Sequence, residues 1–173
     1  MKKAIVVVDM QRDFVRGSLG TAEAQAMLPH LVDKLKREEG ADLFFTLDTH
    51  DAGYLHTQEG KNLPVAHCIK PGPGWEVVEE LSPFLHKAVA AVEKPTFGST
   101  RLPALLAAYD AIEFVGLCTD ICVISNALIV KAFHPEKRIS VDASCCAGVT
   151  PESHKNALAA MKMCQIEVTG EEM

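Results

Sequence analysis

The feature that most constrains the fold is an unbroken apolar run at residues 4–8, which stops at Asp9. Apolar and polar residues do not alternate along this run, as they would in a strand with one face in water. An uninterrupted run is typical of a strand that is buried on both faces, and such strands belong to parallel sheets covered by helices on both sides. The run therefore predicts an α/β fold.

Strands and helices alternate along the rest of the chain. The six predicted strands cover residues 4–9, 43–48, 88–93, 111–116, 138–142 and 165–169. The four predicted helices cover residues 22–39, 100–108, 119–133 and 151–163. A repeated strand–helix order gives a mostly parallel sheet with helices on both faces. We therefore predict a three-layer α/β/α, Rossmann-like fold with a six-stranded sheet.

The composition fits one globular unit. Of the 173 residues, 48% are hydrophobic, which is enough for one domain, residues 1–173, with a full core. A net charge of −6 argues against nucleic acid as a partner. No uncharged apolar segment is long enough to span a membrane, and no basic-then-apolar leader precedes the first strand. We expect a small-molecule substrate, neither nucleic acid nor membrane as a partner, and a homo-oligomer.

The cysteine content indicates a reducing compartment. The six cysteines are Cys68, Cys118, Cys122, Cys145, Cys146 and Cys164. Their spacing contains no C-x-x-C pair, and no secretory signal implies disulfides. We therefore expect reduced thiols in a cytoplasmic protein. Cys145 and Cys146 are expected to be buried structural residues.

Three chemically capable residues stand where predicted strands end. Asp9 follows the first strand, Lys94 follows the third, and Cys122 follows the glycine that ends the fourth. The carboxyl ends of parallel strands face one crevice, and an acid, a lysine and a cysteine together can activate a thiol. A cysteine in the first turn of a helix is also favoured as the thiolate. The structural alternatives are a turn-forming Asp9, a solvated Lys94 and an inert core Cys122.

A fourth strand end carries possible metal ligands. The second predicted strand ends in an Asp-x-His pair, and two further histidines and a glutamate follow in the next loop. The candidate ligands are Asp48, His50, His56, Glu59 and His67. Carboxylate and imidazole ligands together suit zinc, iron or manganese rather than calcium. The alternative is a loop with scattered polar residues.

The order of these elements resembles that of the isochorismatase-like cysteine hydrolases, and within them most of all the nicotinamidases. Three motifs carry the resemblance along nearly the whole chain. They are D-x-Q-x-D-F at residues 9–14, a lysine after a later strand at Lys94, and G-x-x-T-D-x-C-V at residues 116–123. The resemblance implies the isochorismatase-like hydrolase fold.

The resemblance also implies the catalytic groups. Asp9, Lys94 and Cys122 match the three catalytic positions of the family. The oxyanion hole would be formed by the backbone N–H groups of Cys118 and Cys122. A cis peptide bond would join Leu117 to Cys118.

Nicotinamidases resemble this chain further in the loop after the second strand. They have an Asp-x-His pair, then a His or a Glu, then a His just before a Cys, and most other branches of the family lack the metal. The implied ligands of one divalent transition metal, zinc first and iron or manganese as alternatives, are Asp48, His50, His67 and either Glu59 or His56. We favour Glu59, because residues 54–61 read most like the glutamate group. In nicotinamidases the pyridine nitrogen sits on the metal, which would position the substrate.

The same resemblance places Phe14 and Gln11 at the substrate, with plain core as the alternative for Phe14. The preferred function is hydrolysis of nicotinamide to nicotinate and ammonia through a thioester on Cys122. A second hypothesis is another hydrolase of the superfamily, acting on a different amide, a carbamoyl compound or an isochorismate-type vinyl ether. A third is a non-catalytic thiol- or metal-binding protein, which leaves Asp9 and Lys94 unexplained.

Other residues depart from the family pattern or have no place in it. Cys118 stands where the family more often has a small apolar residue, so a second thiol would line the oxyanion site. His154 is expected to be a surface or helix-capping residue and not a ligand. His30, His86 and His134 are expected to be solvated.

Overall fold

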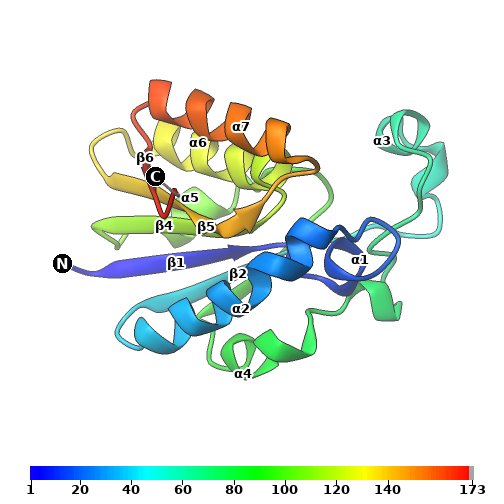
Figure 1. Ribbon diagram of the computed structural model, residues 1–173, viewed down its shortest axis with the longest axis horizontal. Coiled ribbons are helices and arrows are strands. Elements are labelled where there is room, and N and C mark those ends of the chain that lie inside the picture. Colours follow the sequence, from blue (N-terminus) through cyan, green and yellow to red (C-terminus); the bar gives the residue numbers. More distant parts are fainter. Residues whose placement is uncertain (172–173) are drawn as a thin grey trace.

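The computed structural model describes residues 1–171, which form a six-stranded sheet with the strand order β3-β2-β1-β4-β5-β6 (Figure 1). All neighbouring strands are parallel. The strands are β1 (Lys3–Val8), β2 (Asp42–Asp48), β3 (Ala90–Lys94), β4 (Ala111–Leu117), β5 (Arg138–Ala147) and β6 (Glu167–Thr169). The predicted six-stranded parallel sheet is confirmed.

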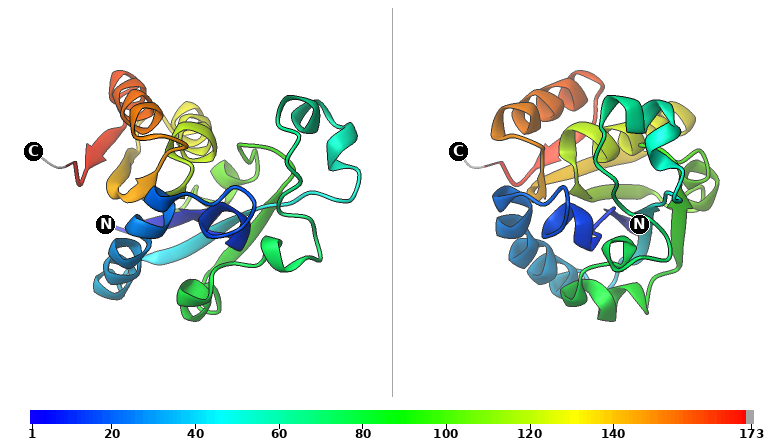
Figure 2. Two further views of the ribbon diagram at one scale, coloured as in Figure 1. Left: turned by 45° about the vertical axis from the view of Figure 1, so that its right-hand side comes forward. Right: turned by 90° about the vertical axis from the view of Figure 1, so that its right-hand side faces the viewer.

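Helices cover both faces of this sheet. Figure 1 shows α2 and α4 on one side and α5, α6 and α7 on the other, and Figure 2 shows the sheet between these layers. The described helices are α1 (Arg12–Val15), α2 (Ala22–Arg37), α3 (Gln58–Asn62), α4 (Ser82–Leu85), α5 (Leu102–Leu105), α6 (Ile124–Phe133) and α7 (Pro151–Met163), with 3-10 turns at Tyr54–His56, Pro73–Trp75 and Glu79–Leu81 and a π-helical turn at Thr119–Val123. Across residues 1–171, no helix has the length and apolar character needed to cross a membrane.

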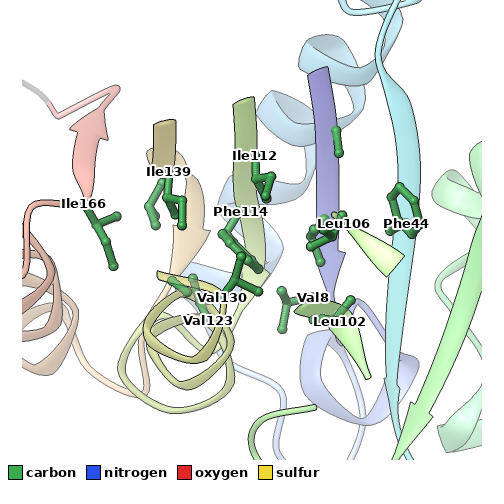
Figure 3. Close-up of a cluster of buried hydrophobic side chains, with 14 of the residues drawn as sticks. Val8, Phe44, Leu102, Leu106, Ile112, Phe114, Val123, Val130, Ile139 and Ile166 are labelled. Carbon is green, nitrogen blue, oxygen red and sulfur yellow. The ribbon is translucent and has the colours of Figure 1, made fainter. Parts of the chain in front are cut away.

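Each face of the sheet carries its own apolar core. β1 supplies Ala4, Val6 and Val8 to one core, and Ile5 and Val7 to the other. Side chains alternate between the two faces of a strand, so a strand with two covered faces needs apolar residues at every position. Figure 3 shows part of the first core, in which side chains from the sheet meet those of α5 and α6. The unbroken run of the sequence is therefore explained by its central place in the sheet.

β5 is longer than predicted. The expected strand ends at residue 142, whereas the structure continues it to Ala147. A register shift against β4 interrupts the ladder, which resumes with the pairing of Gly116 and Cys146. An irregular stretch of this kind disturbs the strict period of a strand, so the sequence does not reveal the extension. Cys145 and Cys146 lie in it and are buried, as expected.

The helix predicted at residues 100–108 is wrong in extent, because only the single turn of α5 is helical. Leu102 and Leu106 are completely buried in the first core, and residues 107–108 are exposed. Most helix stability in proteins comes from packing of the apolar face. Ala107 and Ala108 bury nothing, so no packing extends the helix past Leu106, and Tyr109 enters the core from outside the helix.

The long connection from β2 to β3 is the largest segment for which the sequence predicts neither helix nor strand. It leaves the carboxyl end of β2, forms α3 away from the sheet (Figure 1), and returns to pair His50 with Ile69 in a parallel bridge. Further along, Val77 pairs with Gln11 in an antiparallel bridge. These two bridges attach the long connection to the carboxyl edge of the sheet.

Candidate active site and metal centre

The ends of β1, β2 and β3 meet at one edge of the sheet. Val8 pairs with Thr46, and Asp48 pairs with Lys94, so the polar residues that end these strands come close together. Asp9 follows β1 with a φ of 47°, a left-handed conformation that is uncommon outside glycine. The prediction that the strand-end residues share one edge is confirmed.

Lys94 links the groups at this edge. Its Nζ lies 2.5 Å from Asp9 Oδ2 and 3.5 Å from Cys122 Sγ. The same Nζ lies 3.6 Å from Asp48 Oδ1. The hydroxyl of Thr46 donates to the other oxygen of Asp9, with Oγ1 and Oδ1 2.6 Å apart. Asp9 is 0% exposed and Lys94 is 1% exposed, so acid, ammonium and thiol interact out of contact with bulk water.

Burial changes the protonation of this cluster. It raises the pKa of Asp9, and the attraction of Lys94 offsets only part of that effect. It also raises the pKa of Cys122 well above its usual value, and the neighbouring Asp9 adds to the increase. Burial lowers the pKa of Lys94, but the negative groups of Asp9 and Cys122 outweigh it and raise the pKa overall. The direction for Cys122 is opposite to the lowering of the thiol pKa that a position at a helix start would give.

Cys122, the candidate nucleophile, lies in the π-helical turn Thr119–Val123. The helix predicted over residues 119–133 thus begins as a wider turn before α6, because the N–H of Val123 donates across five residues to Cys118 O, 3.0 Å away. The peptide bond between Leu117 and Cys118 is cis, as the family resemblance implies. Cys122 is buried at the inner side of this turn.

Gly116 explains why the cysteine motif begins with glycine. Its φ is 112°, and a Cβ at this position would lie 2.2 Å from the carbonyl oxygen of Val8. Only glycine combines this backbone conformation with so close an approach. The end of β4 is thereby held against the end of β1, which carries Asp9.

Four of the predicted ligands come together beside the Asp9–Lys94–Cys122 cluster. One ligand atom each from Asp48, His50, Glu59 and His67 lie within 4.8 Å of one another. Asp48 Oδ2 is 3.0 Å from His50 Nε2 and 3.3 Å from His67 Nε2. Glu59 Oε1 is 3.7 Å from both ring nitrogens. His56 is exposed and lies outside this group, so the geometry favours Glu59.

The donor set fits a divalent transition metal. His67 Nδ1 lies 2.8 Å from Val65 O, and a carbonyl only accepts, so Nδ1 carries the hydrogen and Nε2 faces the carboxylates of Asp48 and Glu59. Three electron-rich atoms that face one another need a cation or a proton between them, and metal-binding imidazoles are usually fixed in this way by a bond from the other nitrogen.

Gln11 braces the end of β2. Its Nε2 donates to the carbonyl oxygens of Asp48 and Trp75, both 2.8 Å away. Its Oε1 accepts from the N–H of Asp48, also at 2.8 Å. Gln11 is completely buried, and both ends of its amide hold backbone. Contact between Gln11 and substrate stays a prediction, whereas its positioning of Asp48 is visible.

The other residues of the first motif lie against the metal-ligand loop. Asp13 Oδ2 accepts from the N–H of Cys68 at 2.8 Å, which holds the chain next to His67. The ring centroid of Phe14 lies 5.4 Å from that of His67. Phe14 belongs to the second core and is 9% exposed. The packing of Phe14 on a substrate ring stays a prediction.

Sequence reasoning missed several residues around the site. Thr46 and Asn126 are completely buried and hydrogen-bonded, and each is a polar residue inside an otherwise apolar strand or helix. That interruption is a usable signal, because buried polar groups need partners. Tyr54 is also buried, with its ring centroid 4.7 Å from that of His50 and 4.8 Å from that of His67. No local pattern marks Tyr54.

The expectation that His154 is a surface or capping residue is wrong. The residue is half buried, and its Nδ1 lies 2.7 Å from Oγ1 of Thr119 in the nucleophile turn. α7 packs against that turn, so His154 is partly covered although the first two residues of α7 are exposed. His134 is also half buried and contacts a carbonyl of α5, whereas His30 and His86 are exposed as expected.

Comparisons with known proteins agree with this geometry. The family model of the Isochorismatase domain matches residues 3–173. A protein of Bacillus subtilis (strain 168), described as an uncharacterized isochorismatase family protein PncA, is 30% identical over 174 residues, which cover 92% of this chain and 93% of that protein.

Two solved structures are similar over nearly their whole length. The crystal structure of nicotinamidase/pyrazinamidase PncA from Bacillus subtilis has a TM-score of 0.85 and 28% identity, and covers 98% of this chain and 100% of that one. The pyrazinamidase of Pyrococcus horikoshii in complex with zinc has a TM-score of 0.83 and 26% identity, and covers 99% of this chain and 100% of that one. Family match, relative and fold agree, and the chain belongs to the isochorismatase family.

Proposed function

We propose that this protein is a metal-dependent nicotinamidase, which hydrolyses nicotinamide to nicotinate and ammonia. The observation that carries the proposal is the position of Lys94, whose Nζ contacts Asp9 and Cys122 on one side and Asp48 of the metal-ligand group on the other. Nucleophile and metal ligands thus share one buried edge, within reach of a single small ring. Similarity to proteins described as nicotinamidase and pyrazinamidase supports the same substrate class.

Substrate binding would use the ligand group and the ring beside it. A divalent metal held by Asp48, His50, Glu59 and His67 would supply a coordination position for a pyridine nitrogen. The ring of Phe14 borders this group and offers an apolar face to a planar substrate. The ring would then be fixed at one end, with its carboxamide directed to the nucleophile.

The chemistry would begin with proton transfer from Cys122 to Asp9. Sγ attacks the carboxamide carbon, a carbon–sulfur bond forms, and the carbonyl oxygen becomes an oxyanion. Backbone N–H groups of Cys118 and Cys122 would hold that oxyanion, and such donors contribute about 3 kcal/mol each in comparable sites. Lys94 balances the negative charge of Asp9 in this buried setting.

Collapse of the tetrahedral species breaks the carbon–nitrogen bond. Asp9 returns the proton to the leaving nitrogen, and ammonia departs from a thioester on Cys122. Asp9 then takes a proton from the attacking water, the carbon–sulfur bond breaks, and Asp9 passes that proton to Sγ as the acid product leaves. A single carboxyl serves as base and acid in turn, which suits an Asp9 whose pKa is raised by burial.

The test is ammonia release by the purified protein with nicotinamide, before chelation, after chelation and after return of zinc. We expect release by the metal-loaded protein, loss on chelation and recovery with zinc. Benzamide is the matched control, because it has the same carboxamide and ring size without the ring nitrogen. Benzamide should be hydrolysed more slowly than nicotinamide by the metal-loaded protein. The difference between the two rates should vanish without metal.

Two results decide against the proposal. Zinc-loaded protein that releases no ammonia from nicotinamide is not a nicotinamidase. Full hydrolysis by metal-free protein would instead place this chain with the metal-free hydrolases of its family. Detection of an acyl adduct on Cys122 by mass spectrometry would exclude a non-catalytic thiol-binding function.

A further inference from the structure

We propose that Asn126 is a positioning residue that sets the distance between Lys94 and Cys122. Asn126 lies on α6, one turn after Cys122, and is completely buried. The proposal rests on the proposed function, in which Cys122 is the nucleophile. It concerns how the two catalytic elements, β3 with its following loop and the nucleophile turn, are kept in register.

The amide of Asn126 joins the two elements directly. Its Nδ2 donates to the carbonyl oxygen of Cys122 at 2.8 Å and to that of Phe97 at 3.2 Å. Its Oδ1 accepts from the N–H of Ser99 at 2.8 Å. One bond stays within the helix of the nucleophile, and two cross to the loop that follows β3. Asn126 therefore links the backbone of Cys122 to that loop without any intermediate residue.

The same loop holds Lys94. The Nζ of Lys94 donates to Thr96 O at 3.0 Å, one residue before the Phe97 carbonyl that Asn126 binds. The loop lies directly on α6 at Gly98, where an added Cβ would come within 2.5 Å of Ile129 Cδ1. A shift of the loop away from the helix would therefore move the ammonium relative to Cys122 Sγ.

Asparagine suits this position for a chemical reason. A neutral carboxamide offers two donors and an acceptor at the end of a short side chain. Alanine at position 126 would leave two buried carbonyls and one N–H without these partners, which is costly. Serine can still donate to the carbonyl four residues earlier on its own helix, but it cannot bridge to the loop. Serine and alanine together thus separate the bond within the helix from the bonds to the loop.

The experiment compares Asn126→Ala and Asn126→Ser with Asn156→Ala, an exposed asparagine on α7. Three quantities are measured on zinc-loaded protein. They are kcat for nicotinamide, KM for nicotinamide and the rate of alkylation of Cys122 by iodoacetamide. We expect both Asn126 variants to lose about 10- to 100-fold in kcat, as small misplacements of reacting groups do. We expect KM to stay within about twofold, because ring binding is untouched. The alkylation rate should fall with kcat, and Asn156→Ala should match wild type.

Folded, zinc-loaded Asn126 variants with wild-type kcat and alkylation rates would overturn the proposal. A loss confined to KM would do the same, because it would place Asn126 in substrate binding. If wild-type protein fails to hydrolyse nicotinamide, the proposed function fails, and the alkylation rates still test Asn126.

If the Asn126 variants do not fold, the loop is displaced from its own side with Gly98→Val. An added Cβ lies 3.4 Å from Ser125 Cβ and 3.6 Å from Ser125 C, so the larger side chain meets α6 itself and not only the movable end of Ile129. That variant should lower the alkylation rate, and an unchanged rate in the folded variant contradicts the proposal.

Discussion

Two largely buried clusters of this protein each place a lysine between two carboxylates, with a cysteine nearby. The active-edge cluster consists of Asp9, Asp48, Lys94 and Cys122, and the α2 cluster consists of Lys34, Glu113, Asp142 and Cys145. In the α2 cluster, Lys34 Nζ lies 2.9 Å from Asp142 Oδ2 and 3.1 Å from Glu113 Oε2. A lysine between two carboxylates is therefore not by itself a sign of catalysis.

The clusters differ in where the thiol lies. Cys122 is on a turn beyond the strand ends, 3.5 Å from the ammonium of Lys94. Cys145 lies within β5, where burial and the charge of Asp142 raise its pKa to about 11. Lys34 reaches its carboxylates from the helix that covers the sheet. The same groups thus clamp a helix to the sheet in one region, and in the other they stand at the carboxyl ends of the strands, next to the metal-ligand group.

The contrast between the two thiols predicts the largest effect. Cys122→Ala should lower kcat for nicotinamide by about 10⁴-fold or more, since removal of a nucleophile disables the whole catalytic unit. Cys145→Ala and Cys118→Ala should keep most activity, because no step uses their sulfur atoms. Activity of Cys122→Ala within tenfold of wild type would sink the covalent mechanism.

The Asp9–Lys94 pair of the active-edge cluster predicts the next effect. Asp9→Asn and Lys94→Ala should each lower kcat by about 10³-fold, and the double variant should be barely worse, because groups acting as one unit are not additive. Steady-state kinetics of the three variants, with circular dichroism as the check on folding, measure this. Losses that add in log kcat would show that Asp9 and Lys94 act independently.

Among residues 1–171, the metal-ligand group adjoins only the active-edge cluster. Glu59→Ala should weaken zinc binding by about 100-fold or more. Loss of a residue that only hydrogen-bonds a metal ligand already lowers metal affinity about 10- to 100-fold. It should also raise KM for nicotinamide. His56→Ala, three residues earlier, is the matched control and should keep its zinc by elemental analysis. The reverse pattern would assign His56 as the ligand.

The α2 cluster should affect stability rather than rate. Lys34→Met leaves Asp142 without its ammonium partner and Glu113 with Lys3 alone, and should lower the free energy of unfolding by about 3 kcal/mol. Urea denaturation measures this, and kcat of the folded variant should stay at the wild-type value. A fall in kcat without a loss of stability would give the α2 cluster a catalytic role.

Acid should remove part of this stability. Burial raises the pKa of Asp142, but hydrogen bonds from Ser144 and Lys34 outweigh it and lower the pKa below its usual value. A carboxyl of this kind stabilises the fold above its unfolded pKa of about 3.9, and the contribution is lost as the pH falls through the folded value. The Tm of Asp142→Asn should therefore lie below that of wild type at pH 7, and the gap should shrink below about pH 4. A gap that does not change with pH would show that the charge of Asp142 does not matter.

Several features of this protein were readable in the sequence alone. The run at residues 4–8 predicts a central strand, because burial on both faces acts on every residue of a short segment. The strand ends predict that Asp9, Lys94 and Cys122 meet, because parallel strands bring their carboxyl ends to one edge. These inferences need only local patterns and one rule of topology.

Other features were decided by the tertiary structure. The choice of Glu59 over His56 depends on which side chain of the connecting loop reaches His50 and His67, and the bracing by Gln11 depends on a backbone segment 37 residues away. The raised pKa of Cys122 depends on its burial beside Asp9. Each of these results from contacts between segments far apart in the chain, and a single sequence carries local periodicity but not the distances between such segments.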